Sequence, residues 1–353
     1  MSTQPQSYAN LKSLRIVIIQ PASTPPTADA GGSTPTSVNF GVTAAPVSAE
    51  KQLTLEGFTA TVSITNGGGN MSAQLSAQIY GLSMSDINTV TTIALAPTDA
   101  ELKVQKNTIQ IWAIDGPQST LVFQGTIMNA WGNFNQPDNF LEIDAQAGYV
   151  QKLQSDVPQL SFKGPVDIAT IMGQLAATMG YGFERNDVSV MLYNQSLCGS
   201  AWQQADTAAK AAGIAWGIEN DTTLWITLSA ATPRVITRQG SNGSGGAPNP
   251  GALEPVASIG TGTNTGVWPT PVVSAETGLV SYPTIDAYGV TFRCLFRPDI
   301  RFMQPVQIVS SIPRANHTWL VSGINHHLQS NTPNGAWFSE CRANWIPQTT
   351  TAS

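Results

Sequence analysis

The residues of this 353-residue chain best suited to chemistry are its histidines, of which two are adjacent. His326 and His327 lie in a predicted strand, so their side chains point to opposite faces and cannot chelate one metal ion together without a bulge. Either one could pair across a hairpin with Glu340 or Cys341 and give a Cys/His arrangement. The simpler interpretation, which also covers His317, is a half-buried or surface histidine on a β-ribbon. We therefore expect no catalytic residue and no metal site.

The cysteines are unsuited to a disulfide framework or a zinc site. Cys198, Cys294 and Cys341 are odd in number, far apart and in no CxxC pattern. A zinc site needs several closely spaced thiol or imidazole ligands. We expect the three thiols to be free.

Motifs for phosphate binding, nucleophilic catalysis or metal hydrolysis are missing from the sequence. It contains no P-loop, GxSxG elbow, HExxH or GxGxxG before a helix, and its 22 acidic residues are thinly spread. Trp202, Trp216 and Trp225 could form a sugar-stacking platform, but two of them fall on predicted interior faces and indicate a core. We expect no cofactor and no enzymatic activity.

The surface is polar but weakly charged. Charged residues make up 11% of the chain and the net charge is −6, with no run of Lys or Arg. This composition argues against tight nucleic-acid binding but suits a passage along which DNA slides. It also suits subunits of permanent assemblies, where buried charges are costly. The N-terminus does not resemble a signal peptide and LRIVII is too short to span a membrane, so we expect folding in a cytoplasm.

Residues 1–150 are predicted to form an antiparallel β-barrel or sandwich. Alternating apolar residues at 58–64 and 73–79 flank the turn NGGGN and predict a hairpin with one buried face. Ser83 or Ser85 can cap a short helix after it. Further strands are predicted at 14–19, 103–113, 121–131 and 140–145. Residues 20–51 are a Pro/Thr-rich insertion that predicts a long loop or arm.

Residues 157–228 are predicted to form a small α/β module. Apolar residues at helical spacing predict helices at 166–179 and 201–212, each ended by a glycine, Gly180 and Gly213. A hairpin of 214–218 with 223–227 follows. A flexible linker is expected at 239–250. Strands at 291–296, 305–311, 318–328 and 336–345 then predict a second β domain over 229–353.

Three phrases in this order resemble the baseplate or tail hub proteins of bacteriophages. The first is IYGLSMSDIN (residues 79–88), which follows a long hairpin. The second is DIA (167–169) with Leu175-Ala176 and Gly180. The third runs from Ala201-Trp202 through Gly213-Ile214-Ala215-Trp216 to TLWI (223–226). The resemblance covers most of residues 52–346 and depends on order and spacing.

The resemblance implies a mainly β chain in which two tail-tube-like β domains flank the helix–hairpin module. It implies a homotrimeric ring that adapts the six-fold tail tube, or a distal tail protein, above to the three-fold central spike below. Other baseplate proteins would surround the ring, and genomic DNA would pass through its lumen transiently. The protein would be a virion tail component assembled in the host cytoplasm. Two alternatives remain open: a tail-associated peptidoglycan hydrolase, and a receptor- or glycan-binding tail protein.

Overall fold

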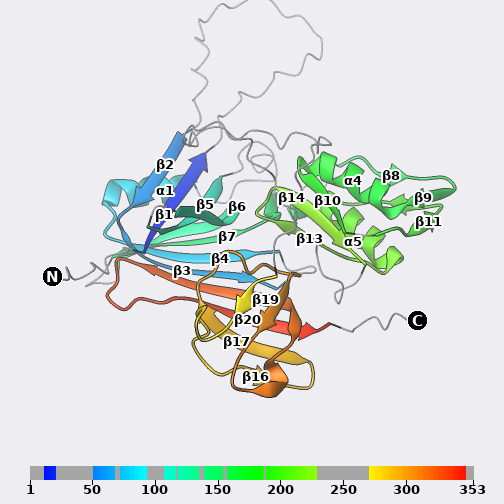
Figure 1. Cartoon of the computed structure of the whole chain (residues 1–353). Helices are drawn as coiled ribbons and strands as arrows, with labels where there is room; N and C mark the ends of the chain where they lie inside the picture. The colour runs from blue at the N-terminus through cyan, green and yellow to red at the C-terminus, as the bar shows by residue number, and fades with distance from the viewer. Residues whose placement is uncertain are drawn as a thin grey trace, which may run out of the picture.

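The protein is mainly β and is built around one large antiparallel sheet with a small α/β module beside it (Figure 1). The computed structural model describes residues 12–20, 51–67, 72–93, 107–116, 118–134, 139–153, 157–186, 188–228 and 270–346. The mainly β class predicted from the sequence is confirmed.

The large sheet has 13 strands. Its strands are β1 (Ser13–Gln20), β2 (Lys51–Glu56), β3 (Thr59–Asn66), β4 (Gln74–Tyr80), β5 (Thr108–Asp115), β6 (Gln118–Asn133), β7 (Phe140–Gln146), β15 (Val272–Val273), β16 (Thr284–Ile285), β17 (Gly289–Leu295), β18 (Pro305–Ile308), β19 (Thr318–Ser330) and β20 (Trp337–Trp345). The main path through the sheet is β16-β17-β20-β19-β3-β4-β7-β6-β5-β1-β2, and β15 and β18 attach beside β19.

The N-terminal strands enclose an apolar core. The predicted β3–β4 hairpin is present, with Ala60 opposite Ile79 and Ile64 opposite Leu75 on its buried face. The helix α1 (Met84–Ile93) follows, and Ser83 Oγ accepts a 3.1 Å hydrogen bond from the N–H of Asp86, as an N-cap residue does. Strands β1 and β5 contribute Ile16, Ile18, Ile109 and Ile111 to the same core. Alternating apolar residues thus predicted the β3–β4 hairpin correctly.

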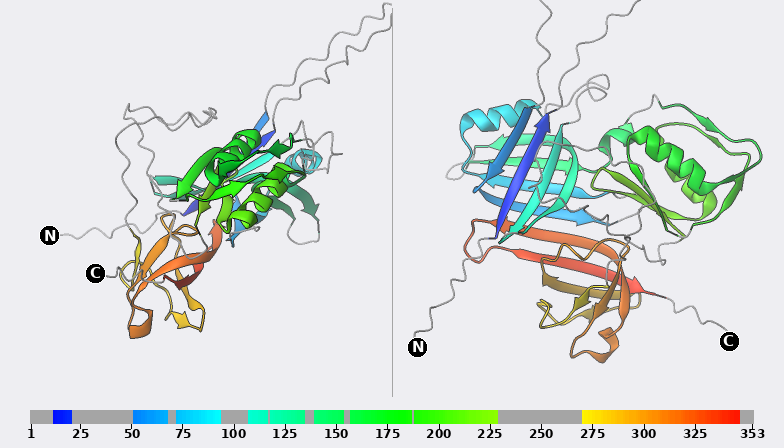
Figure 2. Two further views of the ribbon diagram at one scale, coloured as in Figure 1. Left: turned by 90° about the vertical axis from the view of Figure 1, so that its right-hand side faces the viewer. Right: turned by 45° about the horizontal axis from the view of Figure 1, so that its top comes forward.

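Strand β6 belongs to two pairings and bends the sheet. Its first half pairs with β5, and from Thr126 onward it pairs with β7. The register with β7 shifts between Ile127 and Asn129, where an extra residue bends the strand. This bend brings β5, β1 and β2 over the core (Figure 2).

The two β regions meet in one sheet through β3 and β19. Their antiparallel register runs from Ile324 opposite Asn66 to Ser330 opposite Ala60. A second core lies behind β17, β18, β19 and β20 and includes Phe292, Val306 and Trp319. Whether residues 1–150 and 229–353 behave as two tube-like domains stays a prediction.

The module contains two helices and three small sheets. The short helix α3 (Tyr149–Leu153) leads from β7 to the module, whose own elements are β8 (Leu160–Ser161), β9 (Pro165–Asp167), α4 (Ile168–Met179), β10 (Gly182–Asn186), β11 (Met191–Tyr193), β12 (Ser196–Leu197), α5 (Ala201–Ala212), β13 (Ala215–Glu219) and β14 (Thr223–Thr227). Both helices end at the predicted glycines, Gly180 and Gly213, which adopt the left-handed conformation. The predicted hairpin is β13–β14. The module lies to one side of the sheet (Figure 2).

Some predictions fall outside the described residues, among them the linker at 239–250 and the start of the strand predicted at 103–113. The insertion at 20–51 also falls mostly outside them. Its two ends are described, because Gln20 ends β1 and Lys51 begins β2, and these two residues are paired. Strand β2 was not predicted, although Leu53 and Leu55 alternate with polar residues.

Candidate functional site: the open sheet face and the module junction

One face of the large sheet is mainly polar across seven neighbouring strands, from the second half of β6 to β17, with Phe338 on β20 and Leu295 on β17 as apolar exceptions. In one row, Asn129, Asp144, Ser76, Ser63 and His327 lie side by side on β6, β7, β4, β3 and β19. These side chains are exposed or half-buried. The alternate residues of the same strands are mostly apolar and buried, so the two faces of the sheet are chemically distinct. We call the polar side the open face.

Cations on the open face are paired with carboxylates. Arg293 donates from Nε to Glu340 Oε1 at 3.0 Å, and Arg342 lies 3.5 Å from Asp286 Oδ2. Strand β7 adds two carboxylates, Glu142 and Asp144, to this face. Among the described residues the open face therefore has no surplus of positive charge with which to hold a polyanion.

The two adjacent histidines do point to opposite faces. His327 is on the open face, where its Nε2 lies 3.9 Å from Glu340 Oε2. His326 is on the buried face, where its Nδ1 lies 2.7 Å from Ser339 Oγ. Burial, followed by the charge of His327, lowers the pKa of His326 to about 4. A neutral imidazole of such low pKa is a poor general base, and the Ser339 hydroxyl it contacts is fully buried.

The Cys/His alternative is not formed among the described residues. Cys341 lies in the core opposite Phe292 and hydrogen-bonds with Cys294, while Cys198 is exposed elsewhere. His317 is exposed and contacts the rings of Trp319 and Trp345. In the part of the chain that the structure describes, no group of three or more His, Cys, Asp or Glu side chains is placed to bind a metal ion. No described helix is long and apolar enough to cross a membrane.

The three tryptophans of the module are core residues. Trp202 and Trp216 pack with ring centroids 4.7 Å apart inside the module, and both are buried. Trp225 is also buried and packs on Phe302 at 5.8 Å, where the module meets the C-terminal strands. The sugar-platform interpretation is therefore wrong for these residues, since a stacking platform must be accessible.

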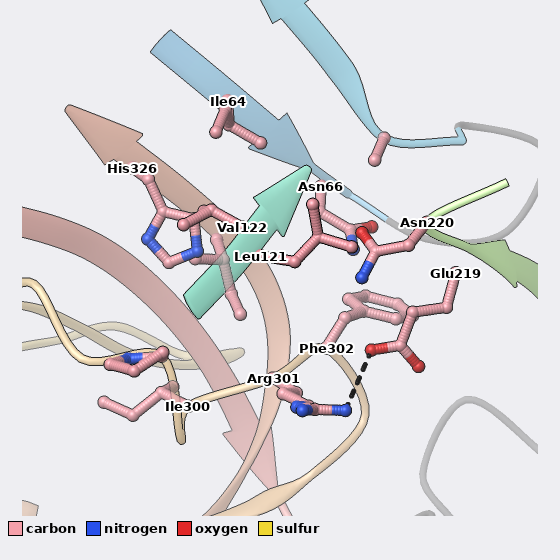
Figure 3. Close-up of a pocket in the computed structure, with 13 residues that line it drawn as sticks. Ile64, Asn66, Leu121, Val122, Glu219, Asn220, Ile300, Arg301, Phe302 and His326 are labelled. Carbon is pink, nitrogen blue, oxygen red and sulfur yellow. Dashed lines mark hydrogen bonds and ion pairs between the residues drawn. The ribbon is translucent and has the colours of Figure 1, made fainter. Parts of the chain in front are cut away.

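A small polar cavity lies where the module meets both β regions (Figure 3). Its volume is about 70 Å³, room for a few water molecules rather than an organic substrate. Asn66 comes from β3, Glu219 and Asn220 from the β13–β14 hairpin, and Arg301 and His326 from the C-terminal part. Arg301 Nη1 bonds with Glu219 Oε1 at 3.4 Å, so an ion pair connects the module to the C-terminal strands.

A second set of contacts connects the module hairpin to the N-terminal β region. Asp221, at the tip of the hairpin, accepts hydrogen bonds from the N–H of Gly148 at 2.8 Å and from the hydroxyl of Tyr181. Burial, and then the Asp221 carboxylate, raise the pKa of Tyr181. Nearby, Lys152 Nζ lies 4.4 Å from the centroid of Trp202 and 3.4 Å from Ser72 Oγ. Burial lowers the pKa of Lys152.

These junction residues were not singled out from the sequence. Their pairings join residues far apart in the chain, such as Arg301 with Glu219, which local periodicity does not indicate. The sequence did indicate the turn itself, because Asn220 and Asp221 lie between two predicted strands. Both residues adopt positive φ, as Asn and Asp do in tight hairpins.

Comparisons with known proteins agree with the predicted resemblance to phage tail hub proteins. Residues 263–341 match a family model described as "Baseplate hub gp41". The 43 kDa tail protein of prophage MuSo2 from Shewanella oneidensis is similar in structure, with a TM-score of 0.51 and 8% identity over 82% of this chain and 93% of that chain. The tail protein from Neisseria meningitidis MC58 has a TM-score of 0.50 and 10% identity, over 82% of this chain and 98% of that chain. Among curated proteins, no sequence matches that of this chain. At these identities the structural similarity shows a shared fold.

Proposed function

We propose that this chain is a structural, non-enzymatic hub of a phage tail baseplate. Three copies form a ring that adapts the six-fold tail tube to the three-fold central spike. The two β regions of each copy line one lumen, through which genomic DNA passes. The family match at 263–341 and the tail-protein fold support a tail component.

The observation that carries the ring proposal is the arrangement of strands behind the open face. The second half of β6 with β7, β4 and β3 makes one group of four, and β19, β20, β17 and β16 make another. The groups are joined side by side at β3 and β19. Three copies would supply six such groups, which matches a six-fold tube above while keeping a true three-fold axis below.

The chemistry of the open face suits a lumen. A polyanion sliding along it meets mainly hydroxyls, amides and carboxylates, and the arginines it meets are paired with acids. DNA would then pass without being held, because tight binding requires phosphates to be neutralised by Lys or Arg.

The partners follow from this position. A tail tube or distal tail protein would stack above the ring and the spike protein would bind below, with other baseplate proteins around it. The chain would be located in the virion tail after assembly in the host cytoplasm. A peptidoglycan hydrolase is not favoured, because the Ser339 hydroxyl is fully buried and the cavity is too small for a glycan strand.

The first test measures assembly. Mass photometry of the purified chain, alone and with the tail tube protein, is expected to give particles three times the 37.3 kDa mass of one chain. Electron microscopy of tails should place the ring between tube and spike. A chain that remains monomeric under both conditions and is missing from tails would contradict the proposal.

The second test addresses the lumen. Ser76 and Gln74 are exposed on β4 in the open face. Arginine at both positions should leave folding and ring formation unchanged but slow DNA ejection from particles, because unpaired cations hold phosphate. The double substitution to Asn is the matched neutral control. Loss of the ring itself in the Arg variant would assign the open face to a subunit contact instead.

A further inference from the structure

Two thiols lie together in the C-terminal core, on neighbouring strands. Cys294 is on β17 opposite Ser339, and Cys341 is on β20 opposite Phe292. The cysteines are therefore diagonal neighbours on the same face of the sheet. Both are buried, and their thiol groups hydrogen-bond with each other.

The surroundings make the two thiols unequal. The hydrogen bond from Cys341, which is the larger effect, and the nearby Arg297 lower the pKa of Cys294. The same hydrogen bond and burial raise the pKa of Cys341. Cys294 is thus the more readily deprotonated thiol of the pair, and the thiolate is the form that reacts with an oxidant.

We propose that Cys294 and Cys341 are an oxidative modification site, at which a hydroperoxide converts the two thiols into a reversible disulfide between β17 and β20. The Cys294 thiolate attacks one peroxide oxygen, the O–O bond breaks, and the departing hydroxide takes up a proton to become water. The Cys341 thiol then attacks the sulfur of the sulfenic acid as the S–O bond breaks, and its proton passes to the departing hydroxide, which leaves as a second water. The two thiols lose two electrons and two protons, and hydrogen peroxide gains them.

The strand geometry predicts that this disulfide is strained. Diagonal partners in a sheet have Cα atoms about 7–8 Å apart, at or beyond the usual limit for a disulfide, so β17 must move toward β20. Strain raises the reduction potential of a disulfide and makes the bond easy to reduce again. The site would therefore be a reversible latch rather than a permanent crosslink.

Access to the buried pair requires only a short segment to open. Residues 278–280 cover the outer edge of β17 through two hydrogen bonds, from Leu295 N–H to Gly278 O at 2.8 Å and from Val280 N–H to Arg293 O at 2.9 Å, which place Leu279 opposite Cys294. Lifting this segment exposes Cys294 while the pairing of β17 with β20 persists. We expect oxidation to be limited by this local opening.

The test uses the purified full-length chain treated with hydrogen peroxide. Thiol titration after unfolding should fall from three groups to one, and mass spectrometry of a digest should find the Cys294 and Cys341 peptides linked, with two hydrogens fewer. The midpoint of thermal unfolding should rise by about 5 °C, since the crosslink closes a long loop, and dithiothreitol should reverse the change.

Matched variants keep the result interpretable. Cys198→Ser removes the exposed thiol and should leave the linked peptides unchanged, whereas Cys294→Ser and Cys341→Ser should each abolish them. If either serine variant fails to fold, the alanine variant and the wild-type digest serve the same purpose. Three free thiols after treatment, or linkage only through Cys198 between chains, would overturn the proposal. The proposal goes beyond the hub function and does not depend on it.

Discussion

The carboxylate of Asp221 accepts a 2.8 Å hydrogen bond from the backbone N–H of Gly148, although 73 residues separate the two in sequence. Gly148 immediately precedes α3, so Asp221 satisfies a helix N-terminal N–H that would otherwise lack a partner. Tyr181 donates to the same carboxylate. The contact therefore fixes the module hairpin against the N-terminal β region.

Weakening this contact should loosen the module. Asp221→Asn keeps a residue suited to the turn but removes the charge, and should cost about 1 kcal/mol of unfolding free energy. Asp221→Ala, which leaves both donors unpaired, should cost about 2–4 kcal/mol. Urea denaturation measures both. Asp206→Asn, which breaks only a surface pair with Lys210, is the control and should change stability by less than about 0.5 kcal/mol. Equal effects at the two sites would contradict the assignment.

Position 148 also requires a glycine because there is no room for a larger side chain. A Cβ at this position would lie 2.9 Å from Ile218 Cδ1 and 3.0 Å from Trp202 Cζ3, and φ is +71°. Gly148→Ala should therefore strain the backbone and displace the module. Together these effects should lower the free energy of unfolding by roughly 2–4 kcal/mol. Gly164→Ala is the matched control, because φ is +83° there but nothing lies within 4 Å of the added atom. The control should show only the backbone cost of about 1 kcal/mol, and thermal unfolding of the pair separates the two effects.

Acid should destabilise the protein in part through His326. The pKa of His326 is about 4 in the folded protein, below the ordinary value near 6.5. Between pH 6.5 and pH 4, therefore, this histidine takes up a proton in the unfolded chain but not in the folded protein. The free energy of unfolding is greatest above pH 6.5 and decreases as the pH falls toward 4. The loss should be on the order of 2–3 kcal/mol.

His326→Asn should remove this share of the pH dependence. Unfolding free energies at pH 7 and pH 4.5 should differ less in the variant than in the wild-type protein. His317→Asn, at an exposed histidine, should behave as the wild type does. Parallel pH profiles for wild type and His326→Asn would contradict the burial argument.

Trp225 should hold the module to the C-terminal strands. Its ring packs on Phe302 in a small cluster with Met303 and Leu320. Trp225→Ala should cost about 3–5 kcal/mol and make the module–strand boundary susceptible to limited proteolysis. Trp202→Ala should cost a similar amount but expose sites inside the module, because Trp202 belongs to the module core. Identical cleavage patterns would show that the two tryptophans do not act in separate clusters.

The elements of the fold were predictable where their signals are local. Period-two alternation predicted β3 and β4, and the glycines at 180 and 213 marked the ends of both module helices. The capping box of Ser200 with Gln203 could also have been found, since its S-x-x-Q spacing is visible in the sequence. Strands of two or three residues, such as β8 and β12, carry too few residues to show any period.

The joining of the two β regions was not predictable in this way. The pairing of β3 with β19 brings Val62 beside Leu328. A local sequence pattern does not indicate which of several apolar strands will pair with a given strand. The same holds for the pairing of Arg301 with Glu219 at the cavity. Such partners are chosen by the packing of whole layers rather than by neighbours in sequence.

The pairing of Gln20 with Lys51 has a practical consequence for the insertion between them. Because the ends of the 21–50 segment leave and re-enter the sheet as neighbours, its length does not alter the register of β1 and β2. The free-energy cost of closing a loop grows only slowly with its length. This position is therefore a natural attachment point, at which a peptide tag or a small foreign domain can be carried without disturbing the sheet.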